Sequence, residues 1–507
     1  MKNKIQSLDS LEKIVIKEKR KKKKIVLCHG VFDLLHVGHI KHFEESKKQG
    51  DLLIVSITTD AYVSKGPNRP AFNEKLRLEA LAALEVIDYI VLSNFPTAIQ
   101  VIKKIKPNIY CKGPDYKKLS EDISGEIKNE KKIIEKLGGK IFFTKDITFS
   151  SSKLINKFAS IHSDNQKTLI NKIKKNYDFV EIKKNIEKFK KMKVLVIGEI
   201  IIDQYFFCEA LGKSGKEAML VLKDIKNESY VGGSGAICRH LSQFCNQISL
   251  ISMLGEKGEK LKEIKDSFRK NIDFKFIKKK NSPTIIKKRF LDYVGNNKVI
   301  GIYSINDDLL ESKNEQELNK LLKKSLPKYD IVIVSDYGHG FISKKNANLI
   351  CRKSKYLSLN AQINAANIGY HSMRNYKNLN CVIINEKEIR HEFRDRNAKI
   401  ELLMKKLSTK QKIKNLIVTS GNQGAKIYNS KQNKFFSCEA YAKTVNDKVG
   451  AGDAMLSILT LCLKLNLSIE MALFTGSLAA AQSVETIGNK ESISKQKILK
   501  TFEHILK

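Results

Sequence analysis

Residues 25–43, IVLCHGVFDLLHVGHIKHF, join an apolar run to a short loop and the start of a helical pattern. The run predicts a strand that ends at Gly30, and we expect a helix to begin near Gly38. His36 and His39 flank that helix start. Free N–H groups and the helix dipole attract phosphate there, and two imidazoles can donate to a phosphate oxygen as charge develops. The stretch therefore predicts a phosphate-binding turn for phosphoryl or nucleotidyl transfer.

Short β-rich runs alternate with amphipathic helical patterns from Lys24 to Ser152. This alternation predicts βαβ units and a parallel sheet. The expected strands are 25–30, 52–57, 89–93, 108–113 and 140–144, and the expected helices lie near 38–49, 73–85, 97–105 and 126–137.

The 507 residues are enough for two or three domains, and the pattern favours two. The first α/β domain is expected over residues 1–158. Residues 159–192 are polar, Lys-rich and helical in pattern, which is typical of a connector. A second α/β domain is expected over residues 193–507, and it begins with the apolar run KVLVIGEIIID.

The chain is strongly basic, with 93 Lys and Arg against 54 Asp and Glu and a formal net charge of +39. Only 11 of the 93 are Arg, the residue best suited to bidentate phosphate and base contacts. Aromatic residues are 8%, with no Trp to stack on bases. We therefore expect no nucleic-acid partner.

Nine scattered cysteines, with no C-x-x-C spacing, argue against a disulfide framework or a zinc site. No run reaches 18 apolar residues, and the N-terminus lacks the apolar core of a signal peptide. We expect a cytoplasmic protein with no membrane partner.

Four segments of the first domain resemble the cytidylyltransferase-like nucleotidyltransferases, a superfamily that joins a nucleoside triphosphate to a phosphorylated alcohol and releases pyrophosphate. The segments are GVFDLLHVGH (30–39), GPNRPAFNEKLRLEALAAL (66–84), KGPDY (112–116) and FSSSKLINKF (149–158). The resemblance implies a Rossmann-like domain.

By this resemblance, His36 and His39 stabilise the α-phosphate. Ser150, Ser151 and Ser152 are implied at the β- and γ-phosphates. Lys112, Gly113 and Asp115 are implied near the base and ribose, and Arg69 or Arg77 near the phosphates or the acceptor. Mg²⁺ is implied as cofactor, and ATP and CTP both stay open. The implied nucleotide-binding residues are Gly30, Phe32, Gly38, Arg69, Lys112, Gly113, Asp115, Ser150, Ser151 and Ser152.

The decisive stretch of the second domain is VNDKVGAGDAMLSILTLCL (445–463). Gly450, Ala451 and Gly452 precede an apolar helix, so backbone N–H groups can line an anion hole. Asp453 lies at the helix start, where it can accept a proton from a substrate hydroxyl. An anion hole beside a carboxylate base is what phosphoryl transfer from ATP to an alcohol requires.

Two other features of this domain are ambiguous alone. Asp203, at the exit of the strand VLVIGEIIID, either holds sugar hydroxyls or caps a helix or faces solvent. Gly232 and Gly233, in VGGSGA, either admit a ligand close to the backbone or make a turn.

The second domain resembles the PfkB/ribokinase family of sugar kinases, whose hallmark is D-[TS]-x-G-A-G-D. Asp447 and residues 450–453 match that hallmark, and SDYGHG (335–340) is similar to a stretch of the heptose-phosphate kinase branch. The resemblance implies a ribokinase-like α/β fold, with Mg²⁺ bound through substrate phosphates and Glu388. Its implied ATP-side residues are Asn385, Glu388, Thr419, Gly421 and Gly424, and its implied sugar-side residues are Asp203, Gly232 and Gly233.

Two positions depart from the kinase pattern. Lys448 replaces Thr or Ser in the hallmark, and Ala236 stands where the branch has a sugar-contacting Asn. The pair of domains resembles the bifunctional heptose-7-phosphate kinase/heptose-1-phosphate adenylyltransferases of lipopolysaccharide synthesis, in reversed order. It implies an enzyme that phosphorylates a sugar or sugar phosphate and then makes an ADP-heptose-like product, and it allows a homodimer. The alternative is a cytidylyltransferase that makes a CDP-alcohol and carries a weak or regulatory kinase domain.

Overall fold

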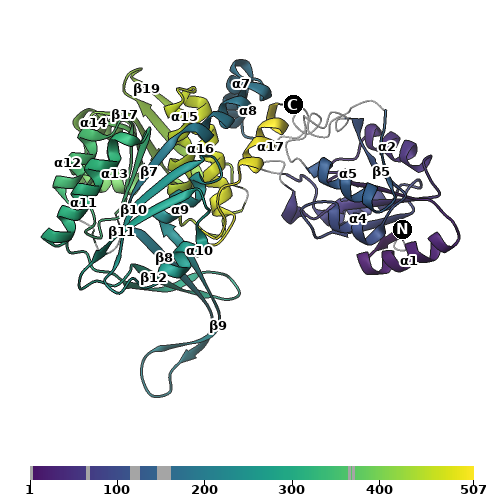
Figure 1. Ribbon diagram of the computed structural model, residues 1–507, viewed down its shortest axis with the longest axis horizontal. Coiled ribbons are helices and arrows are strands. Elements are labelled where there is room, and N and C mark those ends of the chain that lie inside the picture. Colours follow the sequence, from purple (N-terminus) through teal and green to yellow (C-terminus); the bar gives the residue numbers. More distant parts are fainter. Residues whose placement is uncertain are drawn as a thin grey trace. The chain divides into compact units, whose positions relative to one another are not determined.

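The chain divides into two compact units in a computed structural model, and each is described by itself (Figure 1). The first unit comprises Met1–Ser163 with Gln496–Lys507, and the second comprises Asp164–Lys495. The structure describes residues 4–63, 69–114, 126–145, 162–363, 367, 371–442 and 444–506.

The first unit contains a six-stranded parallel sheet in the order β1-β4-β3-β2-β5-β6. Its strands are β1 (Ile5–Gln6), β2 (Ile25–Gly30), β3 (Leu52–Thr58), β4 (Tyr89–Ser93), β5 (Ile109–Lys112) and β6 (Lys140–Phe143). Its helices are α1 (Leu8–Arg20), α2 (Val37–Lys47), α3 (Glu74–Ala82), α4 (Ile99–Ile105), α5 (Glu126–Lys136) and α17 (Lys495–Leu506). The predicted βαβ sheet is confirmed.

Alternating side chains of β2 explain how helices cover both faces of this sheet. Ile25 and Leu27 belong to one buried apolar cluster, whereas Val26 and Cys28 belong to another. Successive strand residues point to opposite faces, so a continuous apolar run fills two cores. The strand order reverses between β2 and β5, and in such folds ligands bind at the carboxyl ends of the strands beside that reversal.

The second unit is built on a nine-stranded sheet in the order β11-β10-β7-β14-β15-β16-β17-β18-β19. The pairings are parallel from β11 to β17 and antiparallel for the last two strands. These strands are β7 (Lys193–Gly198), β10 (Gln247–Gly255), β11 (Ile272–Lys279), β14 (Ile331–Asp336), β15 (Leu357–Ala361), β16 (Leu379–Asn385), β17 (Ile413–Thr419), β18 (Ala425–Asn429) and β19 (Lys434–Cys438).

A separate four-stranded sheet has the order β13-β12-β8-β9. Its strands are β8 (Ile200–Lys213), β9 (Leu220–Gly233), β12 (Ile286–Asp292) and β13 (Lys298–Ser304). The hairpin of β8 and β9 projects from the rest of the unit (Figure 1). Along β13, Val299, Ile300 and Ile302 are about half exposed.

The prediction of one strand with Asp203 at its exit was wrong. The apolar run divides into β7 and β8, which lie in different sheets, and Asp203 lies within β8. Gly198 permits this change of sheet because a Cβ there would clash with the carbonyl oxygen of Ser335 on β14.

The helices of the second unit include two, α7 and α8, in the segment for which the sequence predicts a helical connector. Both belong to the second unit. The helices are α7 (Asp164–Asn176), α8 (Phe179–Lys188), α9 (Ser234–Leu241), α10 (Leu261–Ser267), α11 (Ser312–Ser325), α12 (Lys344–Lys353), α13 (Glu386–Phe393), α14 (Ile400–Gln411), α15 (Ala451–Lys464) and α16 (Ile469–Val484).

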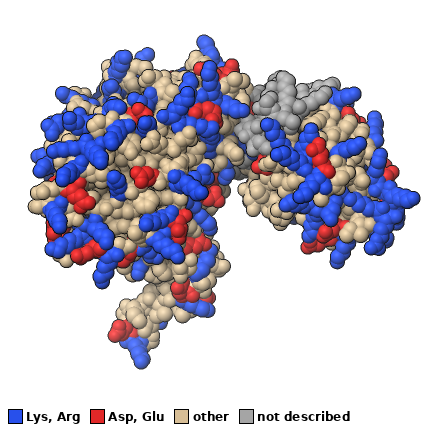
Figure 2. Space-filling view, viewed as in Figure 1, with Lys and Arg blue, Asp and Glu red and all other residues tan. Residues whose placement is uncertain are grey.

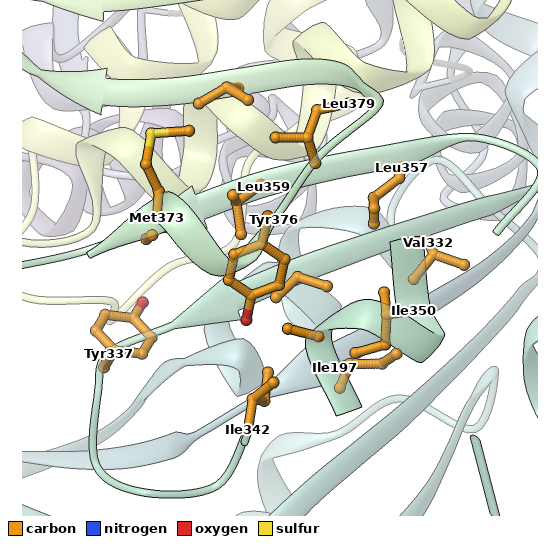
Figure 3. Close-up of a cluster of buried hydrophobic side chains, with 14 of the residues drawn as sticks. Ile197, Val332, Tyr337, Ile342, Ile350, Leu357, Leu359, Met373, Tyr376 and Leu379 are labelled. Atoms are coloured by element: carbon orange, nitrogen blue, oxygen red, sulfur yellow. The ribbon is translucent and has the colours of Figure 1, made fainter. Parts of the chain in front are cut away.

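A large buried apolar cluster lies between the nine-stranded sheet and helices on one of its faces. Val332, Leu357 and Leu359 come from β14 and β15, and Ile350 comes from α12. Figure 3 shows part of this cluster, with Tyr337 at its edge. The cluster thus gives a rigid base to the loop that follows β14.

Basic side chains are distributed widely over the visible surface. Figure 2 shows Lys and Arg scattered across it and interspersed with fewer acidic groups. No helix among the described ranges is both long and apolar enough to cross a membrane.

Candidate functional site

The first candidate site lies at the carboxyl end of β2. Helix α2 begins at Val37, and His36 is its N-cap in an extended conformation. The rings of His36 and His39 stack with centroids 3.9 Å apart. Gly38 is the second residue of the helix. The structure therefore brings the two predicted imidazoles together at a helix start beside the reversal in strand order, where phosphate is favoured.

Phe32 packs against His39 of this pair. Its ring contacts His39 edge-on at 5.3 Å and Phe43 at 5.0 Å between centroids. Phe32 has a φ of 47°, and its ring lies so close to Gly30 that a Cβ there would be 2.9 Å away. Gly30 is therefore required by the packing of Phe32, and the phenyl ring orients His39 rather than facing solvent.

Lys112 and Gly113 lie at the end of β5, the neighbour of β2 on the other side of the reversal. The Lys112 ammonium is 3.5 Å from the Glu130 carboxylate, which also accepts a hydrogen bond from the Tyr110 hydroxyl at 3.0 Å. A Cβ on Gly113 would meet nothing within 4 Å, so there is open space above the end of this strand. Glu130 was not found by sequence reasoning because it lies on α5, away from the quoted motifs.

The two candidate arginines differ in their surroundings. Arg77 is buried and donates to the carbonyl oxygens of Val31, Thr58 and Phe72 at 2.6, 2.9 and 3.1 Å. It also forms an ion pair with Asp60 at 2.6 Å. Arg77 therefore joins the loops that follow β2 and β3, and its donors are engaged by the protein.

Arg69 pairs with Asp33, and both side chains are almost fully buried. The distance from Arg69 Nη1 to Asp33 Oδ2 is 3.4 Å, and the other carboxylate oxygen accepts from the N–H of Phe72 at 3.0 Å. Asp33 lies within the opening stretch of sequence, but only the fold shows that it anchors a segment forty residues later. Asp115, Ser150, Ser151 and Ser152 lie outside the described residues.

The second candidate site lies at the carboxyl ends of the parallel strands of the nine-stranded sheet. Gly450 is the N-cap of α15 with a φ of 86°, and Ala451 and Gly452 form its first turn. A Cβ on Gly452 would meet nothing closer than 4.0 Å, so the approach to this turn is open. The first N–H groups of a helix have no partner within the helix, which favours an anion at this point.

Asp453 follows directly and is 7% exposed. One carboxylate oxygen accepts from the Tyr337 hydroxyl at 2.9 Å, and the other accepts from Asn360 Nδ2 at 3.3 Å. Burial raises the pKa of Asp453 to about 6, and these two hydrogen bonds oppose that rise. The carboxylate is thus held in one orientation with a pKa suited to a base near neutral pH.

Asp203 lies where the two sheets meet and is 3% exposed. Its Oδ1 accepts from Arg289 at 2.5 Å, and a Cβ on Gly232 would clash with its Oδ2. Gly233, with a φ of 59°, lies against the carbonyl oxygen of Glu199. The two glycines therefore allow β9 to approach Asp203 and the end of β7 closely.

Lys287 was not found by sequence reasoning. It pairs in register with Asp203 on the adjacent strand and is 7% exposed. Burial lowers its pKa, opposed by the charge of Asp203. Lys287 and Arg289 alternate on β12, so both point to the same face of the sheet. The sequence feature that could have identified Lys287 and Arg289 is their K-x-R spacing within a strand. That spacing does not predict a binding site until the acid on the neighbouring strand is known.

Asn385 and Glu388 form a capping box at the start of α13. The two Glu388 oxygens accept from the N–H groups of Asn385 and Ile363 at 2.7 and 3.1 Å. Burial raises the pKa of Glu388 to about 7, although these bonds lower it, and the charge of Asp453 adds to the rise. Glu388 therefore lies within electrostatic reach of Asp453.

The predicted nucleotide turn joins β17 to β18. Thr419 ends β17, and Gly421 and Gly424 have φ angles of 60° and 89°. A Cβ on Gly421 would meet open space, whereas one on Gly424 would clash with the carbonyl oxygen of Cys438. Gly424 is thus required by the turn, and Gly421 leaves room beside it.

Asp447 links the hallmark loop to the four-stranded sheet. It accepts from the Tyr205 hydroxyl at 2.7 Å and from Lys298 at 2.5 Å. Burial alone would raise the pKa of Asp447, but these hydrogen bonds hold that pKa below its usual value. Within the described part of the chain, no group of three or more His, Cys, Asp or Glu has the arrangement of a metal site.

Comparisons with known proteins match both parts of the chain to families. The model for the pfkB family carbohydrate kinase matches residues 191–496, which is more than half of the chain, and the Cytidylyltransferase-like model matches residues 27–157. The bifunctional protein HldE of Citrifermentans bemidjiense is 38% identical over 161 residues, 31% of this chain and 32% of that protein. HldE of Geobacter metallireducens is 41% identical over 140 residues, 27% of each chain. The chain thus spans about a third of the length of these curated relatives.

Solved structures show a likeness in fold. Phosphofructokinase-2 from Escherichia coli in complex with potassium has a TM-score of 0.51 and 15% identity, covering 62% of this chain and 100% of that chain. The same enzyme in complex with substrates and products has a TM-score of 0.50 and 16% identity, with the same coverage. The chain belongs to the pfkB family of carbohydrate kinases, and a cytidylyltransferase-like domain precedes its kinase domain.

Proposed function

We propose that the second unit phosphorylates a sugar or sugar phosphate with ATP, and that the first unit transfers a nucleotidyl group to a sugar phosphate. The observation that carries the kinase half is Asp453, oriented by Tyr337 and Asn360 beside the open first turn of α15. The stacked pair of His36 and His39 at the start of α2 supports the other half.

In the kinase reaction, Asp453 accepts the proton of the acceptor hydroxyl. The freed oxygen attacks the γ-phosphorus of ATP, and the bond between that phosphorus and the ADP oxygen breaks. N–H groups of Ala451 and Gly452 receive the charge on the transferring phosphoryl group. Asp203 binds sugar hydroxyls.

A phosphorylated acceptor fits the charges beside Asp203. Lys287 and Arg289 place two cations on one face of β12. Arg289 neutralises Asp203, so Lys287 leaves a net positive charge for an anionic sugar substrate.

In the nucleotidyl reaction, a phosphate oxygen of the acceptor attacks the α-phosphorus of the nucleoside triphosphate, and pyrophosphate leaves. His36 and His39 donate to the α-phosphate as charge develops, and the start of α2 adds its N–H groups. Lys112 and Gly113 bound the base side of this site, and Arg69, paired with Asp33, lies on its phosphate or acceptor side. ATP is the first nucleotide to test and CTP the second.

Mg²⁺ would neutralise the triphosphate in both reactions. It takes oxygen ligands and commonly keeps waters and substrate phosphates among them. Glu388 fits as one ligand, because each of its oxygens accepts a single backbone hydrogen bond and keeps a lone pair.

Together the activities would supply two steps toward a nucleotide-activated sugar such as an ADP-heptose, for surface glycan synthesis. Where the kinase substrate is itself a sugar phosphate, a separate phosphatase must hydrolyse its original phosphate from the bisphosphate before the nucleotidyl transfer. The partial likeness to the bifunctional protein HldE supports two activities in one chain. The net charge of +39 would steer polyanionic substrates toward the chain. The exposed apolar side chains of β13 fit self-association into a homodimer.

The test is to incubate the purified chain with Mg²⁺, ATP or CTP, and D-mannose, D-mannose 6-phosphate or D-glycero-D-manno-heptose 7-phosphate. We expect mass spectrometry to find a sugar monophosphate from D-mannose or a sugar bisphosphate from a sugar phosphate. When a sugar 1-phosphate is supplied, we expect pyrophosphate with a nucleoside-diphosphate sugar. A CDP-alcohol without sugar phosphorylation would favour the alternative. If no phosphorylated sugar and no nucleoside-diphosphate sugar is formed, both halves of the proposal are refuted.

Replacing Tyr337 with phenylalanine is expected to shift the acidic limb of the kinase pH–rate profile upward by about one unit. The Tyr337 hydroxyl favours ionised Asp453, so its loss raises the pKa of the base above about 6 and protonates it at higher pH. The measurement is kcat from pH 5 to 9 at saturating ATP.

Tyr376→Phe is the matched control, because the Tyr376 hydroxyl donates to Asp336 at 2.6 Å instead. Tyr376 is labelled in Figure 3. It should leave the acidic limb in place. An unmoved limb in Tyr337→Phe would show that Asp453 is not the titrating base.

A further inference from the structure

The loop after α16 brings a side-chain amide to the boundary between the two halves of the kinase site. Asn489 is 2% exposed. A Cβ on Gly232 would lie 3.3 Å from its Nδ2, and a Cβ on Gly450 would clash with its Oδ1. Gly232 borders Asp203, and Gly450 begins the anion-binding turn, so this amide lies between the sugar side and the phosphoryl side.

The Asn489 amide makes no hydrogen bond with any residue that the structure describes. Its Oδ1 is buried without a partner, and Nδ2 likewise has none within the described ranges. Buried polar groups in proteins are nearly always hydrogen-bonded, because desolvation without a partner is costly. A ligand that pairs with the amide would remove this cost.

The backbone around Asn489 is fixed without help from its side chain. The N–H of Gly488 donates to Asp447 at 3.1 Å. The carbonyl oxygens of Asn489 and Lys490 accept from the guanidinium of Arg239 at 2.5 and 2.9 Å. None of these contacts uses the side-chain amide, so the amide has no structural role in them.

We infer that Asn489 is a substrate-contacting residue of the kinase site and selects sugars that carry a hydroxyl beside the one phosphorylated. This inference rests on the proposed kinase function. Asp203 Oδ2 and Asn489 Nδ2 both lie against Gly232, and neither is paired within the described chain. One sugar hydroxyl can accept from Nδ2 and donate to Oδ2, which is a recognition that a deoxy sugar cannot satisfy.

The experiment measures kinase kinetics of Asn489→Ala with the acceptor that the wild type phosphorylates in the panel above, and with its mono-deoxy analogues. We expect kcat/KM for the acceptor to fall about tenfold, while the KM for ATP and the melting temperature of the ligand-free chain stay unchanged. For one deoxy analogue, the wild type should have a lower kcat/KM than for the acceptor itself, and the variant should show no further decrease in kcat/KM for that analogue.

Asn489→Asp keeps the shape of the side chain and should also lower acceptor kcat/KM. Asn346→Ala is the matched control, because Asn346 on α12 is fully buried and its Nδ2 is unpaired in the described chain. It should leave acceptor kinetics unchanged.

Wild-type acceptor kinetics in both Asn489 variants would overturn the inference. The inference would also be overturned if the variant lost kcat/KM equally for the acceptor and for ATP and had a lower melting temperature. The same holds if the loss of kcat/KM for every deoxy analogue were as large in the variant as in the wild type. A wild type that phosphorylates no sugar would refute the proposed kinase itself, which distinguishes that failure from the failure of Asn489.

Discussion

Replacing Asp453 with asparagine is expected to lower ATP-dependent sugar phosphorylation by about a thousandfold, while pyrophosphate release by the first unit stays at the wild-type rate. Asparagine keeps the shape of the side chain and cannot accept the hydroxyl proton. The measurement is the rate of ADP formation with the phosphorylated acceptor, beside pyrophosphate release from the same preparation. The expected loss is selective because Asp453 belongs to the second unit and the His36–His39 pair belongs to the first.

The same substitution is not expected to destabilise the fold. Burial raises the pKa of Asp453 to about 6, so the folded chain binds the proton more tightly than the unfolded chain does. Above that pH the ionised carboxylate costs stability, and the neutral amide introduced by Asp453→Asn removes this cost. The melting temperature at pH 7.5 should therefore be unchanged or higher.

Asp330→Asn is the control for Asp453. Asp330 accepts from the N–H of Lys193 at 3.0 Å, at the amino ends of β14 and β7. It lies at the edge of the sheet away from the site, so phosphorylation should persist. A kinase that retains more than about a tenth of its rate in Asp453→Asn would contradict the assignment of the base.

The strands of the first unit were predictable because each is a local apolar run. The predictions of 25–30 and 89–93 match β2 and β4 to the residue, and 52–57 differs from β3 by one residue. In contrast, β1 has only two residues, Ile5 and Gln6, which is too short to show any periodicity.

The second sheet of the kinase unit could not be predicted from local pattern. Residues 193–203 read as one apolar strand, and nothing in such a run says which neighbour each half pairs with. The change of sheet depends on Ser335, which lies against Gly198 from 137 residues away. Hydrophobic periodicity predicts which residues are buried, but it does not predict which strands pair.

The candidate sites show the same division. The histidines and the G-A-G-D run were identifiable because they are contiguous. The contacts that orient Asp453 were not, since Tyr337 and Asn360 come from the ends of two separate strands. Only a sheet with parallel strands brings those ends to one edge.

Replacing His39 with alanine is expected to slow nucleotidyl transfer by about 10²–10³-fold and to leave sugar phosphorylation unchanged. His39 stacks on His36 at the start of α2, where charge on the α-phosphate would develop. Its loss removes one donor and also the ring that Phe32 contacts, so the thermal stability of the first unit must be measured beside the rate. The assay is pyrophosphate release with a sugar 1-phosphate and ATP or CTP.

Two further variants separate chemistry from damage to the helix. Lys47→Ala removes the ion pair with Asp88 at the other end of α2 and should keep the wild-type rate. His36→Ala removes the second imidazole but not the contact with Phe32, so it should slow transfer to a similar extent with less loss of stability. If His39→Ala alone is impaired, and only in proportion to its loss of folded protein, the ring supports Phe32 and takes no part in the reaction. If both histidine variants are folded and slow, the two imidazoles act on the phosphate at the start of α2.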